Sequence, residues 1–198
     1  PHPAFSVERG GLWTYHGPGQ WIAYPIVRLE EPNALGFLLS IEAWGVAICQ
    51  ALGVAACCRE QASGIWMAEA PGHKLGSVGL AFRRWVAWHG LALNLQRDSG
   101  FDAIHPCGFK ANQIGSLHQA GAQALEHASV SRVALALLPH YVAVSQPALL
   151  TLSDLQAELE TRETTTIRGM SLEGASCEQR LASDYPASAV PAWGTAAP

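Results

Sequence analysis

Apolar side chains recur at helical spacing in one segment near the start of the chain. Residues 34–52 carry them every three to four positions, at Phe37, Ile41, Trp44, Ile48 and Leu52. Asn33 directly precedes this segment and is a favourable N-cap, while Gly53 follows it and is typical of a helix C-terminus. The pattern predicts a helix over residues 34–52 that packs one face inward.

Short apolar runs bounded by glycines follow this helix and predict β-strands. The runs are residues 54–58, 64–68, 75–81, 85–88 and 91–95. Arg83 and Arg84 lie near a predicted turn between two of them. Before the helix, residues 21–29 form an extended segment in which Pro25 indicates an edge position or a bulge. Together these segments predict a largely antiparallel sheet.

The C-terminal half contains a second helical pattern and then loses regularity. We predict a helix over residues 130–144, opened by Ser129 or Ser131, with inward-facing side chains at Val133, Leu137 and Tyr141. A weaker helix is expected over residues 153–160. From residue 161 the chain is rich in Thr, Ser, Ala, Gly and Pro, so residues 161–198 are predicted to be a disordered tail after one domain at 1–160.

Composition narrows the classes of protein to consider. A chain of 198 residues with 14% charged residues can bury a single core. Its net charge of −4, with no basic cluster longer than Arg83–Arg84, disfavours a nucleic-acid partner. The most hydrophobic window, residues 43–58, is shorter than the about 20 residues of a membrane span. The five cysteines, two of them adjacent, are a poor disulfide framework, and no signal peptide opens the chain, so we expect a cytoplasmic protein with no membrane partner.

The glycine-rich stretch RGGLWTYHGPGQ, residues 9–20, is the first candidate for chemistry. Glycines let a ligand approach backbone N–H groups that a Cβ atom would shield. The Gly17–Pro18–Gly19 turn could hold His16 in place. A glycine-rich loop with a solvated histidine is the alternative interpretation. The stretch matches no G-x-G-x-x-G or P-loop pattern, so a nucleotide phosphate is not indicated.

The second candidate is the thiol in HPCGF, residues 105–109. Pro106 restricts the backbone before Cys107, and Gly108 leaves space beside its side chain, which suits a presented nucleophile. Most cysteines are instead small buried hydrophobes, and Cys49, Cys57 and Cys58 are better interpreted in that way.

A lysine is the third candidate. Lys74 and Lys110 are the only lysines among twelve basic residues of the Lys and Arg types. Arginine cannot give up its proton, whereas a desolvated lysine can, so a lysine at the start of an apolar strand indicates a chemical role for Lys74. A surface lysine that extends its ammonium to water is the alternative, and Lys110 is the rival partner for Cys107.

Two other kinds of site receive no support from the residue spacing. The eight histidines are scattered, and neither C-x-x-C nor H-x-x-x-H occurs, so we expect no metal site. No G-x-S-x-G motif is present, which disfavours a serine nucleophile of the hydrolase type.

Taken in order, five motifs resemble those of the octanoyltransferases of lipoate biosynthesis, the LipB family. They are RGGLWTYHGPGQ, GIWM, HKLGSVG, WVAWHGLALNL and HPCGF, and they extend from Arg9 to about Gly115. The predicted helix over 130–144 fits the C-terminal helix of that family. The resemblance implies an α+β (α/β) fold like the catalytic domain of biotin and lipoate protein ligases, with a mixed, largely antiparallel sheet and flanking helices. Family members have an additional segment before Arg9, so the 1–160 domain is expected to lack its N-terminal portion.

The resemblance also implies an activity without a cofactor. An octanoyl group would pass from octanoyl-acyl carrier protein to an enzyme cysteine as a thioester, and then to a lysine of a lipoyl domain. Lipoyl domains of 2-oxo acid dehydrogenases and the glycine cleavage H protein are the implied acceptors. Carried onto this chain, the catalytic residues would be Cys107 as nucleophile, Lys74 as its activator and His16 beside the reacting end. The substrate-binding residues would be Arg9, Gly10, Gly11, Leu12, Trp13, Thr14, Tyr15, His16, Ser77, Val78, Gly79, Gly90, Leu91 and Ala92.

Two alternatives remain at this point. An ATP-dependent lipoate or biotin protein ligase of the same fold would activate a carboxylate and need no cysteine, so Cys107 beside Gly108 and the lack of a G-R-G-R-type loop favour the transferase. The chain could also be a non-catalytic relative that only binds lipoyl domains or acyl chains.

Overall fold

A computed structural model describes residues 3–60, 62–70, 72–104, 108–123 and 125–142, and the structural statements below concern these residues. One antiparallel sheet has the strand order β1-β6-β5-β4-β3, with β2 also paired to β6. The strands are β1 (Gln20–Ala23), β2 (Val27–Arg28), β3 (Ala56–Arg59), β4 (Ala62–Met67), β5 (Lys74–Arg83) and β6 (Val86–Asn94). The α-helices are α1 (Ala34–Ala51) and α2 (His127–Leu137), and short 3-10 helices are η1 (Ser99–Ala103), η3 (Ala111–Gln113) and η4 (Leu138–His140).

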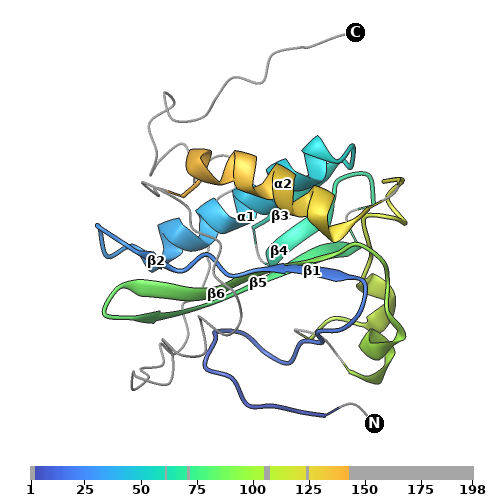
Figure 1. The fold of residues 1–198 in the computed structure, drawn as a ribbon. Coiled ribbons are helices and arrows are strands. Elements are labelled where there is room, and N and C mark those ends of the chain that lie inside the picture. Colours follow the sequence, from blue (N-terminus) through green and yellow to red (C-terminus); the bar gives the residue numbers. More distant parts are fainter. Residues whose placement is uncertain (1–2, 61, 71, 105–107, 124, 143–198) are drawn as a thin grey trace, which may run out of the picture.

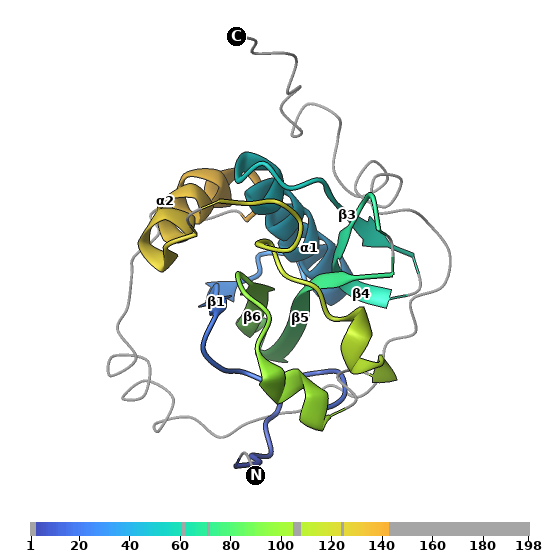
Figure 2. The same ribbon diagram turned by 90° about the vertical axis from the view of Figure 1, so that its right-hand side faces the viewer.

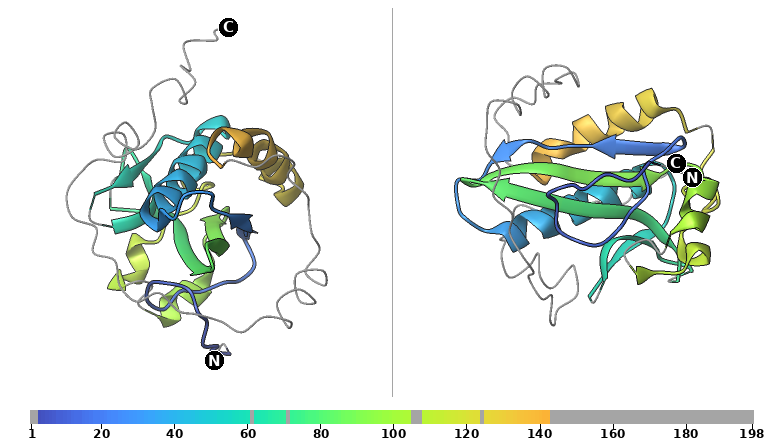
Figure 3. Two further views of the ribbon diagram at one scale, coloured as in Figure 1. Left: turned by 90° about the vertical axis from the view of Figure 1, so that its left-hand side faces the viewer. Right: turned by 90° about the horizontal axis from the view of Figure 1, so that it is seen from below.

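The two faces of the sheet have different coverings. Helices α1 and α2 lie side by side over one face, while the N-terminal segment, residues 3–19, crosses the other face (Figures 1 and 2). From below, this segment is seen to loop across β5 and β6 (Figure 3, right). The hydrophobic core fills the space between helices and sheet, and Ile41, Ile65 and Leu93 are among its fully buried side chains. The opposite face is therefore left for a site.

Helix α1 confirms the predicted helix at 34–52 and its two ends. The Asn33 side chain accepts a hydrogen bond from the Gly36 N–H at 2.8 Å, and Gly53 has a φ of +79° just after the last turn. By length and by its mean hydropathy of 1.5, this helix could cross a membrane, but 61% of it is buried inside the protein. Burial of that extent against the sheet and α2 is typical of a helix in a protein core.

The hairpin of β5 and β6 corrects one part of the predicted sheet. Residues 85–88 and 91–95 were predicted as two strands, but β6 runs unbroken from Val86 to Asn94 and pairs in register with β5. Strands β1 and β2 pair with the other edge of β6 on either side of residues 88–90, and the unbroken pairing with β5 carries the strand through His89–Gly90. The turn predicted at Arg83–Arg84 is confirmed: Arg84 and Trp85 have φ of 48° and 62°, as a two-residue hairpin turn requires.

The extended segment predicted at 21–29 is also confirmed. It contains β1 and β2, which pair with the same strand, and Pro25 lies in the interruption between them. Since proline has no N–H to give to a ladder, that interruption is where it can be accommodated.

Helix α2 begins earlier than predicted and packs a different face. It starts at His127, three residues before the predicted start, and neither Ser129 nor Ser131 caps it. The buried side chains are Val130, Ala134 and Leu138, whereas the predicted Val133, Leu137 and Tyr141 are only partly buried at the margin of the core. Two tryptophans fix this face, because the indole N–H of Trp21 donates to Ser131 Oγ at 2.9 Å and that of Trp44 donates to the Ala134 carbonyl at 3.0 Å. Residues 143–144, the helix predicted at 153–160 and the tail at 161–198 lie outside the described residues.

Candidate active site

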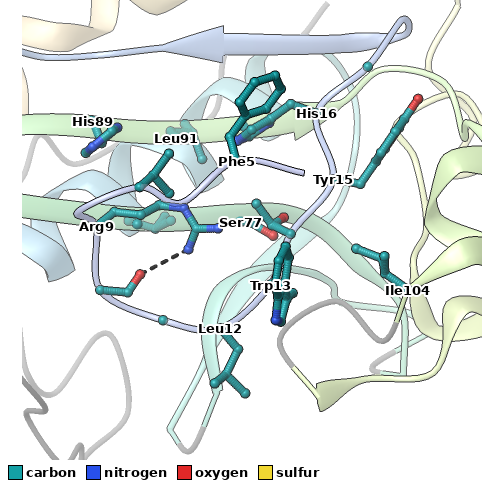
Figure 4. Close-up of a pocket in the computed structure, with 18 of the residues that line it drawn as sticks. Phe5, Arg9, Leu12, Trp13, Tyr15, His16, Ser77, His89, Leu91 and Ile104 are labelled. Carbon is teal, nitrogen blue, oxygen red and sulfur yellow. Dashed lines mark hydrogen bonds between the residues drawn. The ribbon is translucent and has the colours of Figure 1, made fainter. Parts of the chain in front are cut away.

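A cavity of about 1570 Å³ lies on the face of the sheet opposite the helices. The N-terminal segment forms its roof, and β5 and β6 form its floor (Figure 4). Three groups of residues singled out in the sequence line it together, namely 9–16 from the roof, 77–79 from β5 and 90–92 from β6. Lys74, at the start of β5, lines it as well. The fold thus brings the roof, β5 and β6 to one cavity.

Arg9 lies over β5 because that strand has a glycine beneath it. A Cβ atom on Gly79 would stand 2.8 Å from Arg9 Cδ, so any side chain there would displace the arginine. The Gly10 N–H donates to the Leu80 carbonyl at 3.0 Å, which ties this part of the roof to the strand. Arg9 Nη1 donates to the Gly10 carbonyl at 3.1 Å (Figure 4), and the half-buried guanidinium faces the cavity.

The roof has a second attachment at Tyr15. Its ring packs edge-on against Phe101 of η1, with 5.2 Å between the ring centroids. Hydrogen bonding to Asp98 is the main cause that raises the pKa of Tyr15. Asp98 in turn accepts a hydrogen bond from the Gly100 N–H at 2.7 Å and caps η1. Tyr15 therefore joins the roof to the segment that leads towards residue 105.

Two imidazoles share the cavity with Arg9. Desolvation lowers the pKa of His16; the hydrogen bond that His16 makes to Gln20 Oε1 opposes this effect, and the positive charge of Arg9 adds to it. Desolvation likewise lowers the pKa of His89, with Arg9 and His16 lowering it and Glu8 raising it. Since an ordinary histidine titrates near ~6.5, both rings are neutral at pH 7. The cavity therefore places the fixed positive charge of Arg9 beside two uncharged proton acceptors.

His89 is a cavity residue that the sequence patterns did not identify. It pairs with Leu80, which packs towards the core, and paired residues of antiparallel strands face the same side. Its φ of 58° breaks that rule, and the ring lies in the cavity with Arg9 and His16 instead. A strained non-glycine residue held by its surroundings is typical of functional sites. The available signal was a single imidazole beside glycine inside an otherwise apolar strand.

Lys74 is buried, which excludes the surface interpretation. Its side chain is 3% exposed, and Nζ lies 5.4 Å from the ring centre of Trp66 and 5.2 Å from that of Phe109. Gly64, with a φ of +118°, provides the room, because a Cβ atom there would stand 2.5 Å from Lys74 Cε. Lys110 is instead exposed at the start of η3.

Cys107 and its neighbours at 105 and 106 lie outside the described residues. The chain reaches the cavity on both sides of them, since Ile104 and Phe109 line it. A Cβ atom on Gly108 would be 3.9 Å from Leu12 Cδ1 in the roof.

The other cysteines of the described chain lie away from the cavity. Cys49 is buried in α1, as predicted, and burial raises the pKa of its thiol to about 12. Cys57 and Cys58 are half-buried in β3 rather than fully buried. Within the described ranges, no three His, Cys, Asp or Glu side chains are grouped so that they could hold a metal ion.

Comparison with known proteins agrees with this geometry. Residues 2–138 match the family described as lipoyl protein ligase A/B catalytic domain. An octanoyltransferase of Acidiphilium cryptum is 37% identical over 153 residues, which cover 72% of this chain and 67% of the relative. An octanoyltransferase of Nitrobacter hamburgensis is 40% identical over 121 residues, covering 57% of this chain and 50% of the relative. The chain therefore spans about half to two thirds of the length of these curated relatives.

The fold has a counterpart among solved structures. A lipoate protein ligase-like protein from T. acidophilum, solved with bound lipoic acid, superimposes with a TM-score of 0.60 at 12% identity, covering 77% of this chain and 64% of the other. At that identity the likeness establishes the architecture, which confirms the predicted ligase-like fold with its mixed, largely antiparallel sheet and flanking helices. With the match over most of the described residues, the chain belongs to the lipoyl protein ligase A/B catalytic domain family.

Proposed function

We propose that this chain is an octanoyltransferase of lipoate biosynthesis that acts in the cytoplasm. It takes the octanoyl group of octanoyl-acyl carrier protein onto Cys107 and passes it to a lysine of a lipoyl domain, in 2-oxo acid dehydrogenases or the glycine cleavage H protein. The observation that carries the proposal is the buried Lys74 in the cavity beside Phe109, two residues after Cys107 in the chain. The octanoyltransferase relatives support the same reaction.

In the first half-reaction, Lys74 activates the thiol. A free cysteine thiol has a pKa of about 8.5, and a neighbouring ammonium group stabilises the thiolate. The Cys107 thiol gives its proton to the neutral Lys74 amine, and the thiolate attacks the carbonyl carbon of the octanoyl thioester. The Lys74 ammonium then passes that proton to the carrier's sulfur as its bond to the acyl carbon breaks. One thioester replaces another, so this step needs no ATP.

In the second half-reaction, the lipoyl-domain lysine attacks the octanoyl-cysteine thioester as a neutral amine. A carbon–nitrogen bond forms, and the nitrogen then carries one proton more than the amide product. It gives this proton to Lys74, and the bond from the acyl carbon to Cys107 Sγ breaks. The product is an amide, and the cysteine is regenerated. A lysine that can both give and accept a proton serves both halves, which arginine could not do.

The cavity supplies a matching surface for an acyl thioester. Leu12, Trp13 and Phe5 are exposed apolar side chains along the roof, suited to a hydrocarbon chain (Figure 4). The glycines of the roof have no Cβ atom that would keep a carbonyl oxygen away from the backbone. Arg9 and His16 provide polar groups at the same cavity.

The test is to incubate the protein with octanoyl-acyl carrier protein in the absence of nucleotide and to map the acylated residue. We expect one octanoyl group, labile to hydroxylamine, on Cys107, and its transfer to an added lipoyl domain. Cys107→Ser should abolish adduct and transfer, whereas Cys49→Ser, the matched control at a buried cysteine outside the cavity, should retain both. An adduct on a different cysteine would refute the mechanism, and a requirement for ATP would identify a ligase instead.

A further inference from the structure

Hydrogen bonds through two side-chain amides, here called the amide chain, connect the Gly115 carbonyl to His16. Asn94 Nδ2 donates to the Gly115 carbonyl at 3.0 Å, and Gln20 Nε2 donates to Asn94 Oδ1 at 2.9 Å. Gln20 Oε1 then receives the Gly17 N–H at 3.3 Å and lies 3.1 Å from His16 Nδ1. Both amide side chains are buried, with 7% of Gln20 and 4% of Asn94 exposed.

Both ends of this chain have fixed hydrogen-bonding roles. The Gly115 carbonyl can only accept, so Asn94 must direct its NH₂ group there and its oxygen towards Gln20. Gln20 must then give its NH₂ group to Asn94 and keep its oxygen for the other side. The Gly17 N–H can only donate, and it independently requires the same orientation of Gln20.

One consequence reaches the imidazole. A glutamine oxygen can only accept, so His16 Nδ1 must carry the hydrogen in the neutral ring. The proton of a neutral imidazole occupies one nitrogen, which leaves Nε2 with a lone pair. His16 lines the cavity, and no partner of Nε2 occurs among the described residues.

We propose that Gln20 and Asn94 are positioning residues that hold His16 in its Nδ1–H tautomer, so that Nε2 offers a proton-accepting lone pair to the cavity. The structural part of this proposal stands without the reaction; its chemical part rests on the proposed function. There, Nε2 takes one proton from the ammonium of the incoming lipoyl-domain lysine, which leaves a neutral amine and an imidazolium. The imidazolium returns that proton to water. After the attack, the nitrogen of the lipoyl-domain lysine gives a second proton to Lys74.

The tautomer can be observed directly by ¹⁵N NMR of histidine-labelled full chain above the titration of His16, with the signal assigned by its loss in His16→Gln. In the parent protein, Nε2 should resonate as an unprotonated nitrogen and Nδ1 as a protonated one. Gln20→Met removes the acceptor, so the two nitrogens should shift towards an average of both tautomers. Ser116→Ala, which removes a buried hydroxyl outside the amide chain and its two hydrogen bonds with Gln119, should leave the pattern of His16 unchanged.

Two substitutions of Asn94 separate tautomer control from stability. Asn94→Asp loses the donor to Gly115 but keeps an acceptor for Gln20, so the protein should be destabilised while His16 retains its tautomer. Asn94→Leu removes both contacts and leaves the long Gly17 N–H bond, at 3.3 Å, to orient Gln20 without Asn94. Gln20 should then turn over in part of the population, and the tautomers should mix in part. Identical His16 spectra for these two variants would overturn the proposal, as would an unchanged spectrum in Gln20→Met.

The reaction provides a second readout. Gln20→Met should slow transfer from acyl-enzyme to lipoyl domain by at least about tenfold, within the ~10²–10⁴-fold range of a general base. Formation of the acyl-enzyme should change by less than about twofold, because that half does not use His16 as base. Equal loss in both halves would refute the assigned proton transfer. If the parent protein shows no transfer at all, the proposed function fails, and the NMR result still decides the amide chain.

Discussion

Exchanging each lysine for arginine tests which of them activates the thiol. Lys74→Arg keeps a positive charge but removes an amine that can release its proton. We expect transfer to fall by the ~10²–10⁴-fold that general acid–base catalysis contributes. Lys110→Arg is the matched control, because Lys110 is exposed and its ammonium has room for a guanidinium.

The structure also predicts the effect of Lys74→Arg on stability. Lys74 is 3% exposed, its Cε approaches Gly64, and its Nζ lies just over 5 Å from the centres of two aromatic rings, at 5.4 Å and 5.2 Å. A bulkier guanidinium overpacks this space, which typically costs about 1–3 kcal/mol. At about 2–4 °C per kcal/mol for a chain of this size, Tm should drop by roughly 2 to 12 °C.

The two effects are separated by measuring transfer and thermal unfolding on the same preparations, below the transition of the less stable variant. At such a temperature, Lys74→Arg should be folded and yet nearly inactive. Lys110→Arg should match the parent protein in both measurements. Equal losses of transfer at the two positions, or a larger loss at Lys110, would show that Lys74 is not the activating residue.

Three further predictions concern other parts of the structure. Gly79→Ala should leave Tm nearly unchanged but raise KM, because the new Cβ meets the flexible Arg9 side chain at 2.8 Å and the nearest backbone atom only at 3.5 Å. The contribution of His16 and His89 to stability should be fully present above about pH 6.5 and be lost as the pH falls below it, because the unfolded histidines then bind protons that the folded ones, with lowered pKa values, do not. His89→Gln should therefore flatten the fall in acid unfolding curves. Iodoacetamide at neutral pH should spare Cys49 in the folded protein, since burial raises its pKa to about 12, and mass spectrometry after labelling would reveal the opposite.

Local signals in the sequence were sufficient for much of the fold. Asn33 and Gly53 act on their own helix ends, so the limits of α1 could be predicted from neighbouring residues alone. The continuity of β6 could not, because residues 88–90 are held in the strand by pairing with another segment, β5. The start and packing face of α2 also depend on distant partners, since Trp21 and Trp44 reach it from elements far away in sequence.

The candidate site divides in the same way. The stretch around residues 9–16 was singled out by its glycines and 77–79 and 90–92 by resemblance, and the fold places all three on one cavity. Whether Lys74 is buried could not be predicted, because a lysine beside an apolar strand can extend to water or pack beneath aromatic rings. His89 was missed because its position follows from a backbone φ of 58°, which strand alternation does not anticipate. The amide chain to His16 joins residues 74 positions apart, Gln20 and Asn94, and has no local signature.

The roof of the cavity is expected to open locally while the core stays folded. Among the described residues from 3 to 16, the backbone makes one hydrogen bond to the sheet, between the Gly10 N–H and the Leu80 carbonyl. Segments with few such bonds open with a free energy far below that of global unfolding. Amide hydrogens of the roof should therefore exchange with solvent long before those of the β5–β6 hairpin. Mutations in the roof can then alter the shape of the cavity while the core keeps its stability, so the selectivity of the proposed acyl site and the folding of the chain can evolve separately.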